Sequence, residues 1–190
     1  MDHARSIDDV WLITMLNSFS GSRAFGRKGI SYLAGIVARR YNAGYFADDV
    51  NWFASQTPST TSIQVGLISE PASDDGSDFS YQWLGYFRPT TSQTYTFYLS
   101  SDDASYMWIA ANAISGFTTS NAVVNNGGLH GVVEQSGNIA LSAGVYYPIR
   151  IQFGERGGGD VCTFSFSTST ISKTTDTTGL TFYNPATMGI

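Results

Sequence analysis

Two adjacent aspartates, Asp102 and Asp103, stand in the polar segment SSDDAS between two apolar segments of the chain. Their mutual repulsion is relieved if a cation lies beside them, and hard cations such as calcium take oxygen ligands from loops of this kind. Aspartate is also common in solvated turns, because its side chain bonds readily to nearby backbone groups. The residue types and their spacing therefore leave two interpretations open, a cation site and an ordinary turn.

The segments on both sides of the aspartates have the pattern of β-strands. Between Thr94 and Leu99, large apolar side chains alternate with threonine or tyrosine, which is the period of a strand whose two faces differ. We predict strands near residues 79–88, 93–100 and 105–111, so that the two aspartates lie in the turn between the second and the third of these strands. We also predict strands near residues 63–68, 145–153 and 161–167, and a long loop over residues 112–137.

The composition indicates one all-β domain. The 190 residues are 42% hydrophobic and 14% aromatic but only 13% charged, and short alternating runs of this kind favour strands over helices. Cys162 is the only cysteine, so an intrachain disulfide is excluded. Because Cys162 alternates with Phe164 and Phe166, we predict that it is a buried thiol of the core.

Charge is spread unevenly along the chain. Residues 1–40 contain six basic and three acidic residues, which gives +3, and the other 150 residues contain four basic and twelve acidic residues, which gives −8. An acidic body argues against nucleic acid as a partner. The apolar run Ile30–Ala38 is too short to cross a membrane, since about 20 residues are needed. We therefore expect no membrane insertion and predict that this run is a strand or short helix packed on another part of the protein.

We predict two parts, an N-terminal arm over residues 1–40 and a β-sandwich over residues 41–190. Ser6 to Ser18 has a capping serine, two early aspartates and apolar residues on one face, which predicts a short amphipathic helix in the arm. The first residues are not typical of a signal peptide, because acidic residues interrupt them.

The familiar catalytic motifs are missing from the sequence. Gly157–Gly159 lack the Lys-Ser/Thr pair of a phosphate-binding loop, no Gly-x-Ser-x-Gly segment occurs, and His3 and His130 are far apart. Adjacent aspartates of an extended chain point to opposite sides, which is poor geometry for acid–base catalysis on one substrate. We expect that the protein is not an enzyme and that both histidines lie on the surface.

Several segments, taken in order, resemble the GLEYA-type adhesin domain, a branch of the protective-antigen-type lectin-like β-sandwich superfamily. They are Trp-x-Gly-Tyr-Phe at 83–87, Tyr-Thr-Phe at 95–97, the Asp-Asp turn, and Gly-x-Tyr-Tyr-Pro-x-Arg-Ile at 144–151. The resemblance covers residues 41–170. It implies a jelly-roll-like antiparallel β-sandwich, in agreement with the short alternating strands.

The resemblance also implies a site. In sugar-binding members of that family, two adjacent aspartates hold a calcium ion through a cis peptide bond. Carried over, Asp102 and Asp103 bind calcium, and Glu155 stands where those members have an asparagine. Asp102, Asp103, Arg156 and Asp160 then contact a carbohydrate. Calcium takes about six to eight oxygens, so the loop at 155–160 must approach the turn. In an alternative, Arg156 pairs with an aspartate in the place of the metal.

Two classes of function follow. The first is a non-enzymatic structural or surface-decorating protein of a virion, for example of a phage tail, in which residues 1–40 attach to other virion subunits in a homo-oligomer or larger assembly. Fungal members of the family are secreted and disulfide-bonded, and the sequence shows neither trait. The second is an extracellular, calcium-dependent adhesin that binds cell-surface glycans. A further alternative is an accessory carbohydrate-binding domain of a glycan-degrading system.

Overall fold

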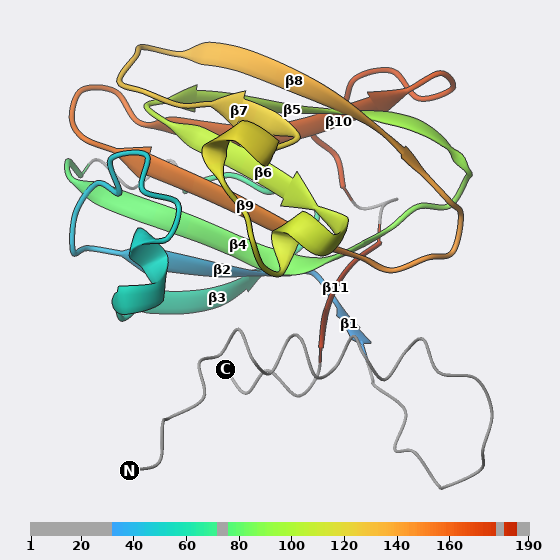
Figure 1. Ribbon diagram of the computed structural model, residues 1–190, viewed down its shortest axis with the longest axis horizontal. Coiled ribbons are helices and arrows are strands. Elements are labelled where there is room, and N and C mark those ends of the chain that lie inside the picture. The colour runs from blue at the N-terminus through green and yellow to red at the C-terminus, as the bar shows by residue number, and fades with distance from the viewer. Residues whose placement is uncertain (1–31, 72–75, 178–180, 186–190) are drawn as a thin grey trace, which may run out of the picture.

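The computed structural model describes residues 32–71, 76–177 and 181–185, which are built mainly of β-strands (Figure 1). The strands are β1 (Tyr32–Ala34), β2 (Ile36–Tyr41), β3 (Thr60–Gln64), β4 (Phe79–Arg88), β5 (Gln93–Asp102), β6 (Ser105–Ile109), β7 (Val124–Asn126), β8 (Val133–Leu141), β9 (Tyr147–Glu155), β10 (Val161–Thr168) and β11 (Thr181–Pro185). The same residues contain three single-turn 3-10 helices, η1 (Trp52–Ser55), η2 (Ala110–Ala113) and η3 (Thr119–Asn121). No helix among them is long and apolar enough to cross a membrane.

The strands form two sheets that lie one above the other in Figure 1. The larger sheet has the order β1-β11-β4-β9-β6-β7, and β2 pairs with both β4 and β3. The smaller sheet has the order β10-β5-β8. The pairings between these strands are antiparallel. The predicted all-β, antiparallel sandwich is thereby confirmed.

The main hydrophobic core lies between the two sheets. In β5, Tyr95, Phe97 and Leu99 are fully buried, and the residues between them lie on the opposite, partly exposed face. This alternation is expected where one face of an antiparallel sheet meets a core. From the larger sheet, Ile149 and Ile151 of β9 pack into the same core. Burial of each such side chain stabilises the fold by about 1.5–3 kcal/mol.

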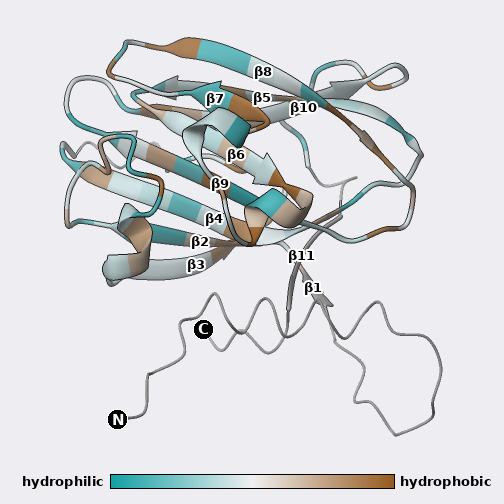
Figure 2. Ribbon diagram, viewed as in Figure 1, coloured by the Kyte–Doolittle hydropathy of each residue, from teal (hydrophilic) through white to brown (hydrophobic). Residues whose placement is uncertain are grey.

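The larger sheet is covered on its other face as well. A second cluster there consists of Tyr41, Phe46, Val50, Phe53, Ala104, Tyr106, Trp108 and Ala113. β4 is consequently buried along nearly its whole length. Figure 2 shows hydrophilic residues among hydrophobic ones along β4 and β9. Gln82 of β4 and Gln152 of β9 are almost completely buried. In this sheet a polar side chain therefore does not mark a solvent-exposed face.

The predicted boundary between an arm at 1–40 and a sandwich at 41–190 is wrong. Residues 32–40 belong to the larger sheet, because β2 pairs with β4 through Val37 and Leu84 and β1 pairs with β11. The apolar run ends in this strand, where Ile36 is fully buried; burial of its apolar side chains gives the strand its place in the fold. The helix predicted over Ser6 to Ser18 lies outside the described residues.

The remaining strand predictions hold with two changes. β3 covers 60–64, whereas the sequence indicated a strand over 63–68. β8 begins at Val133, inside a segment predicted to be a long loop over 112–137. The first half of β8 is exposed, so it lacks the apolar alternation by which a strand is recognised in a sequence. Cys162 is buried in the core, as predicted.

Candidate functional site

The turn between β5 and β6 carries Asp102 and Asp103 at one end of the sandwich. The peptide bond between them is cis. Behind the turn, the hydroxyl groups of Ser101 and Ser105 lie 2.7 Å apart in a hydrogen bond, and both residues are fully buried. The side-chain Nδ2 of Asn126 donates a hydrogen bond to Ser101 Oγ at 2.9 Å. Residues on both sides of the aspartates are thus held together by buried hydrogen bonds.

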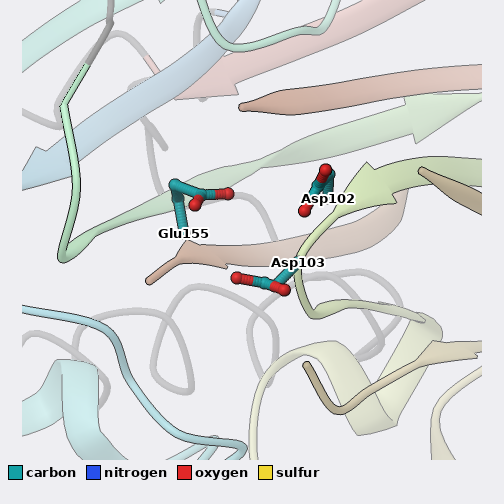
Figure 3. A group of neighbouring side chains, drawn as sticks. All are labelled: Asp102, Asp103 and Glu155. Atoms are coloured by element: carbon teal, nitrogen blue, oxygen red, sulfur yellow. The ribbon is translucent and has the colours of Figure 1, made fainter. Parts of the chain in front are cut away.

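Glu155, the last residue of β9, meets the two aspartates from the neighbouring strand end. One carboxylate oxygen of each of Asp102, Asp103 and Glu155 lies within 4.8 Å of the others, and Figure 3 shows the three carboxylates converging. The backbone links the two parts of this group, because the N–H of Gly154 donates to the carbonyl oxygen of Ala104 at 2.9 Å. The prediction that the side chains of adjacent aspartates diverge fails here, since the chain is not extended at the cis bond.

Asp103 also fixes two loops through its carboxylate. Its Oδ1 accepts a hydrogen bond from the backbone N–H of His130 at 2.9 Å, and its Oδ2 accepts one from the backbone N–H of Arg156 at 3.1 Å. The loop between β7 and β8 and the loop between β9 and β10 are thereby attached to the turn. Asp103 is 5% exposed, so these two bonds form in a largely water-free setting, where charge-assisted bonds are strong.

Crowding of the carboxylates makes their ionisation costly. Burial, followed by the negative charge of Asp103, raises the pKa of Glu155 to about 7. The backbone N–H of Gly157 acts in the opposite direction, but it does not reach hydrogen-bond geometry, and both carboxylate oxygens of Glu155 are buried without a partner among the described residues. The pKa of Asp102 is raised as well, chiefly by burial and then by Asp103. His130 lowers the pKa of Asp102 but does not outweigh burial and the charge of Asp103.

The loop at 155–160 lies close to the turn, as the resemblance required. A side chain at Gly159 would begin 3.9 Å from Asp102 Oδ2, and Gly158 has φ +116°, a conformation that favours glycine. Asp160 adds a fourth carboxylate near Asp102 and Glu155, and its Oδ2 is buried without a hydrogen-bond partner in the described part of the chain.

Arg156 takes part through its backbone only. Its side chain is exposed, and among the described residues its guanidinium group makes no ion pair within 4.0 Å. The alternative in which Arg156 fills the place of a metal therefore does not describe this structure. Of the residues predicted for the site, Asp102, Asp103 and Glu155 come together, Asp160 lies beside them, and the Arg156 side chain stays at the edge.

Two parts of the site were missed by the sequence analysis. His130 had been assigned to the surface without a role, yet its backbone holds Asp103. Tyr45 lies close enough to Asp103 and Glu155 for their negative charges to contribute to its raised pKa, although it is 58 residues before Asp103. The sequence carries no local signal for either contact, because both join segments that are distant along the chain.

Residues 79–168 match the GLEYA domain family. The matched segment makes up just under half of the chain, and it resembles a GLEYA domain. The match begins with β4 and ends with β10, so it includes Asp102, Asp103 and the loop at 155–160. No curated protein sequence matches the chain.

Solved structures with the same fold cover most of the chain. The Epithelial Adhesin 6 A domain from Candida glabrata was solved in complex with Galβ1-3GlcNAc. Its TM-score is 0.66 and its identity 17%, and the match covers 85% of this chain and 92% of the solved A-domain chain. The PA14 domain of the MpAFP antifreeze protein has a TM-score of 0.62 and 16% identity over 84% of this chain and 96% of its own.

A PA14 sugar-binding domain from an RTX adhesin is a third relative. Its TM-score is 0.57 and its identity 14%, and the match covers 75% of this chain and 94% of that domain. At such low identities these likenesses show the fold. The fold that they share with this chain is the predicted β-sandwich. The absence of enzymatic activity, the calcium ion and the residues of the site stay predictions.

Proposed function

We propose that this GLEYA-like domain is a calcium-dependent carbohydrate-binding module of an adhesin. The observation that carries the proposal is the convergence of Asp102, Asp103 and Glu155 from two strand ends, with buried carboxylate oxygens of Glu155 that have no hydrogen-bond partner among the described residues. A buried carboxylate without a partner is costly unless a cation neutralises it. A hard cation bound between the three carboxylates would neutralise their charge and accept their oxygens as ligands.

The donor set fits calcium. Calcium binds oxygen at about 2.3–2.6 Å, so two ligands on one ion lie up to about 5 Å apart, and the three carboxylates lie within 4.8 Å of one another. Asp102, Asp103 and Glu155 would hold the ion. Asp160, whose charge acts on both Asp102 and Glu155, would offer a further carboxylate oxygen. When bound, calcium would supply open coordination positions for vicinal sugar hydroxyl groups.

The protein groups around this position orient the two loops that flank a ligand. Asp103 holds the loop at His130 and the loop at Arg156 through backbone N–H groups, so both loops keep one position relative to the turn. The Arg156 side chain extends into solvent at the edge, where its guanidinium N–H groups are available to ligand oxygens.

The charge of the site favours a neutral glycan. When ionised, Asp102, Asp103, Glu155 and Asp160 carry four negative charges and Arg156 carries one positive charge. These sum to −3, or to −1 with one divalent cation. A sialylated or sulphated glycan would add like charge and is disfavoured by electrostatic repulsion.

The relatives support this reading. The Epithelial Adhesin 6 A domain was solved with Galβ1-3GlcNAc, and the domain from the RTX adhesin is described as sugar-binding. We infer by analogy that this domain acts on the outside of a cell or particle, where such glycans are met. Attachment to a virion or phage tail stays a prediction. The part of residues 1–40 that would serve such attachment lies before Tyr32, because β1 and β2 belong to the sandwich.

A glycan array tests the proposal. The protein is applied to neutral and acidic glycans, including Galβ1-3GlcNAc, once with millimolar calcium and once with excess chelator. We expect binding to neutral glycans that disappears with chelator and is absent in Glu155→Gln. Glu134→Gln is the matched control, because Glu134 lies on β8 and pairs with Lys173. Binding that is insensitive to chelator and to Glu155→Gln contradicts the proposal, as does the absence of binding at all.

A further inference from the structure

Tyr45 is held beside the acidic site by β4. The buried hydroxyl group of Ser80 accepts a hydrogen bond from the N–H of Phe46 at 3.1 Å and donates one to the carbonyl oxygen of Gly44 at 2.9 Å. The peptide groups on both sides of Tyr45 are therefore fixed. The Tyr45 ring also packs edge-on against Phe46, with 5.6 Å between ring centroids. This loop precedes residues 79–168, to which the family match is confined.

The ring of Tyr45 lies on the backbone link between the two parts of the site. A Cβ atom at Gly154 would come within 2.8 Å of Tyr45 Cδ2, so only glycine lets the ring approach the chain there. Gly154 precedes Glu155, and its N–H donates to the carbonyl oxygen of Ala104, which follows Asp103. Tyr45 is partly exposed. A partly exposed aromatic ring thus borders the carboxylates at this edge.

A second apolar side chain is held at the same edge by two carboxylates. The N–H of Gly128 donates to Asp48 Oδ1 at 3.2 Å, and the N–H of His130 donates to Asp103 Oδ1 at 2.9 Å. Leu129 stands between these two residues and is 55% exposed. A leucine in so well-fixed a backbone, yet open to solvent, is available for contact with a ligand.

Asp48 joins the two loops. Its Oδ1 accepts hydrogen bonds from the Tyr106 hydroxyl group at 2.9 Å and from the N–H of Gly128. Asp48 is three residues after Tyr45 and binds the residue before Leu129. The loop of Tyr45 and the loop of Leu129 are therefore connected to each other as well as to the acidic site.

We propose that Tyr45 and Leu129 form an apolar rim on the Asp103 side of the site and that this rim contacts the carbon face of a bound pyranose. The inference rests on the proposed function and adds the residues that select the ligand. Binding sites of small molecules combine aromatic and aliphatic walls with a few polar groups, and Tyr45 lies near the carboxylates of Asp103 and Glu155. A pyranose presents hydroxyl groups to one part of such a site and C–H groups to the other.

The experiment compares glycan and calcium affinities in the full chain. Tyr45→Ala, Tyr45→Phe and Leu129→Ala are titrated first with calcium and then, at saturating calcium, with the neutral glycan that binds tightest on the array. Leu67→Ala is the matched control, because Leu67 is also exposed, at 47%, and lies beside β10 on the other edge of the smaller sheet. We expect Tyr45→Ala and Leu129→Ala to weaken glycan binding about tenfold, because each variant loses apolar contact area equivalent to about one or two buried methylene groups. We expect unchanged calcium affinity in all four variants, near-normal glycan binding in Tyr45→Phe, and normal glycan binding in Leu67→Ala.

The outcomes separate this inference from the proposed function. If the unmodified protein binds calcium and a glycan, and Tyr45→Ala and Leu129→Ala bind that glycan equally well, the rim is wrong and the proposed function stands. If calcium affinity falls together with glycan affinity in Tyr45→Ala, the residue supports the metal position and the rim is again wrong. If the unmodified protein binds no glycan, both proposals fail.

Discussion

Asp103 and His130 are joined by a hydrogen bond from the His130 backbone N–H to Asp103 Oδ1, 2.9 Å long. The two residues stand 27 positions apart in the chain, and His130 belongs to the loop that leads into β8. A second hydrogen bond runs from the Arg156 N–H to Asp103 Oδ2. Asp103 therefore joins its own turn between β5 and β6 to the loop before β8 and to the loop after β9. Asp102 is more exposed and has no comparable role in the described residues.

The two aspartates should therefore differ in their contribution to stability. In excess chelator, Asp103→Ala leaves two backbone N–H groups without their acceptor and should lower the free energy of unfolding by about 3 kcal/mol. Asp102→Ala removes a partly exposed carboxylate whose charge repels its neighbours and should change it by less than about 1 kcal/mol. Urea denaturation measures both. Equal losses would show that Asp103 does not hold the loops.

Calcium binding should depend on Glu155 and not on acidic residues in general. Calorimetric titration of the unmodified protein should give a saturable signal at millimolar calcium or below, and the melting temperature should rise with calcium. Glu155→Gln should weaken the affinity at least about tenfold, since one charged ligand is lost. Glu134→Gln, which makes the same chemical change on β8, should bind normally. A protein without any calcium signal would leave Asp102 and Asp103 as turn residues.

Without calcium, stability should fall as the pH rises through neutrality. The pKa of Glu155 is raised from its ordinary value of 4.5 to about 7 in the folded protein. Between these values the folded state binds a proton that the unfolded state has released, so this contribution to stability is complete below about pH 4.5 and is lost as the pH rises past 7. Melting temperatures in chelator at pH 5, 6, 7 and 8 should decline, and Glu155→Gln should flatten the decline relative to Glu134→Gln. An equal slope in both variants would assign the effect to other groups.

Truncation should locate the true start of the sandwich. Deletion of residues 1–31 leaves all the described strands present, whereas deletion of residues 1–40 removes β1 and most of β2. Ile36, Val37 and Ala38 are at most 2% exposed, and the loss of such burial costs several kcal/mol, a large part of the total stability of a domain. We expect a cooperative thermal transition in the first truncation and none in the second. Normal unfolding of both would show that β2 is dispensable.

Gly137 in β8 should not tolerate a side chain. A Cβ atom there would overlap the carbonyl oxygen of Val123, so Gly137→Ala forces the backbone before β7 away and should cost about 1–3 kcal/mol. Gly131→Ala is the control, because nothing lies within 4 Å of its Cβ position. Chemical denaturation of both variants measures the difference. Equal stability would mean that β7 and β8 are not in close contact.

Much of the fold could be predicted from local patterns. β4, β5, β9 and β10 were found close to their observed bounds, because alternation with period two is a property of neighbouring residues. β2 was assigned to the arm, and the start of β8 was missed. β2 was misassigned because its role depends on pairing with β4, more than forty residues later, and β8 because its first half is exposed.

The sequence by itself determined that Asp102 and Asp103 stand in a turn between strands and that the loop at 155–160 carries further acids. Only the tertiary structure decided that Glu155 meets the aspartates, that Arg156 contributes its backbone, and that Tyr45 lies near Asp103 and Glu155. These pairs of residues are 52 to 110 positions apart. Their formation depends on how the sheets pair and pack, because long-range contacts are made only when the whole sandwich closes and are not encoded in the order of neighbouring residues.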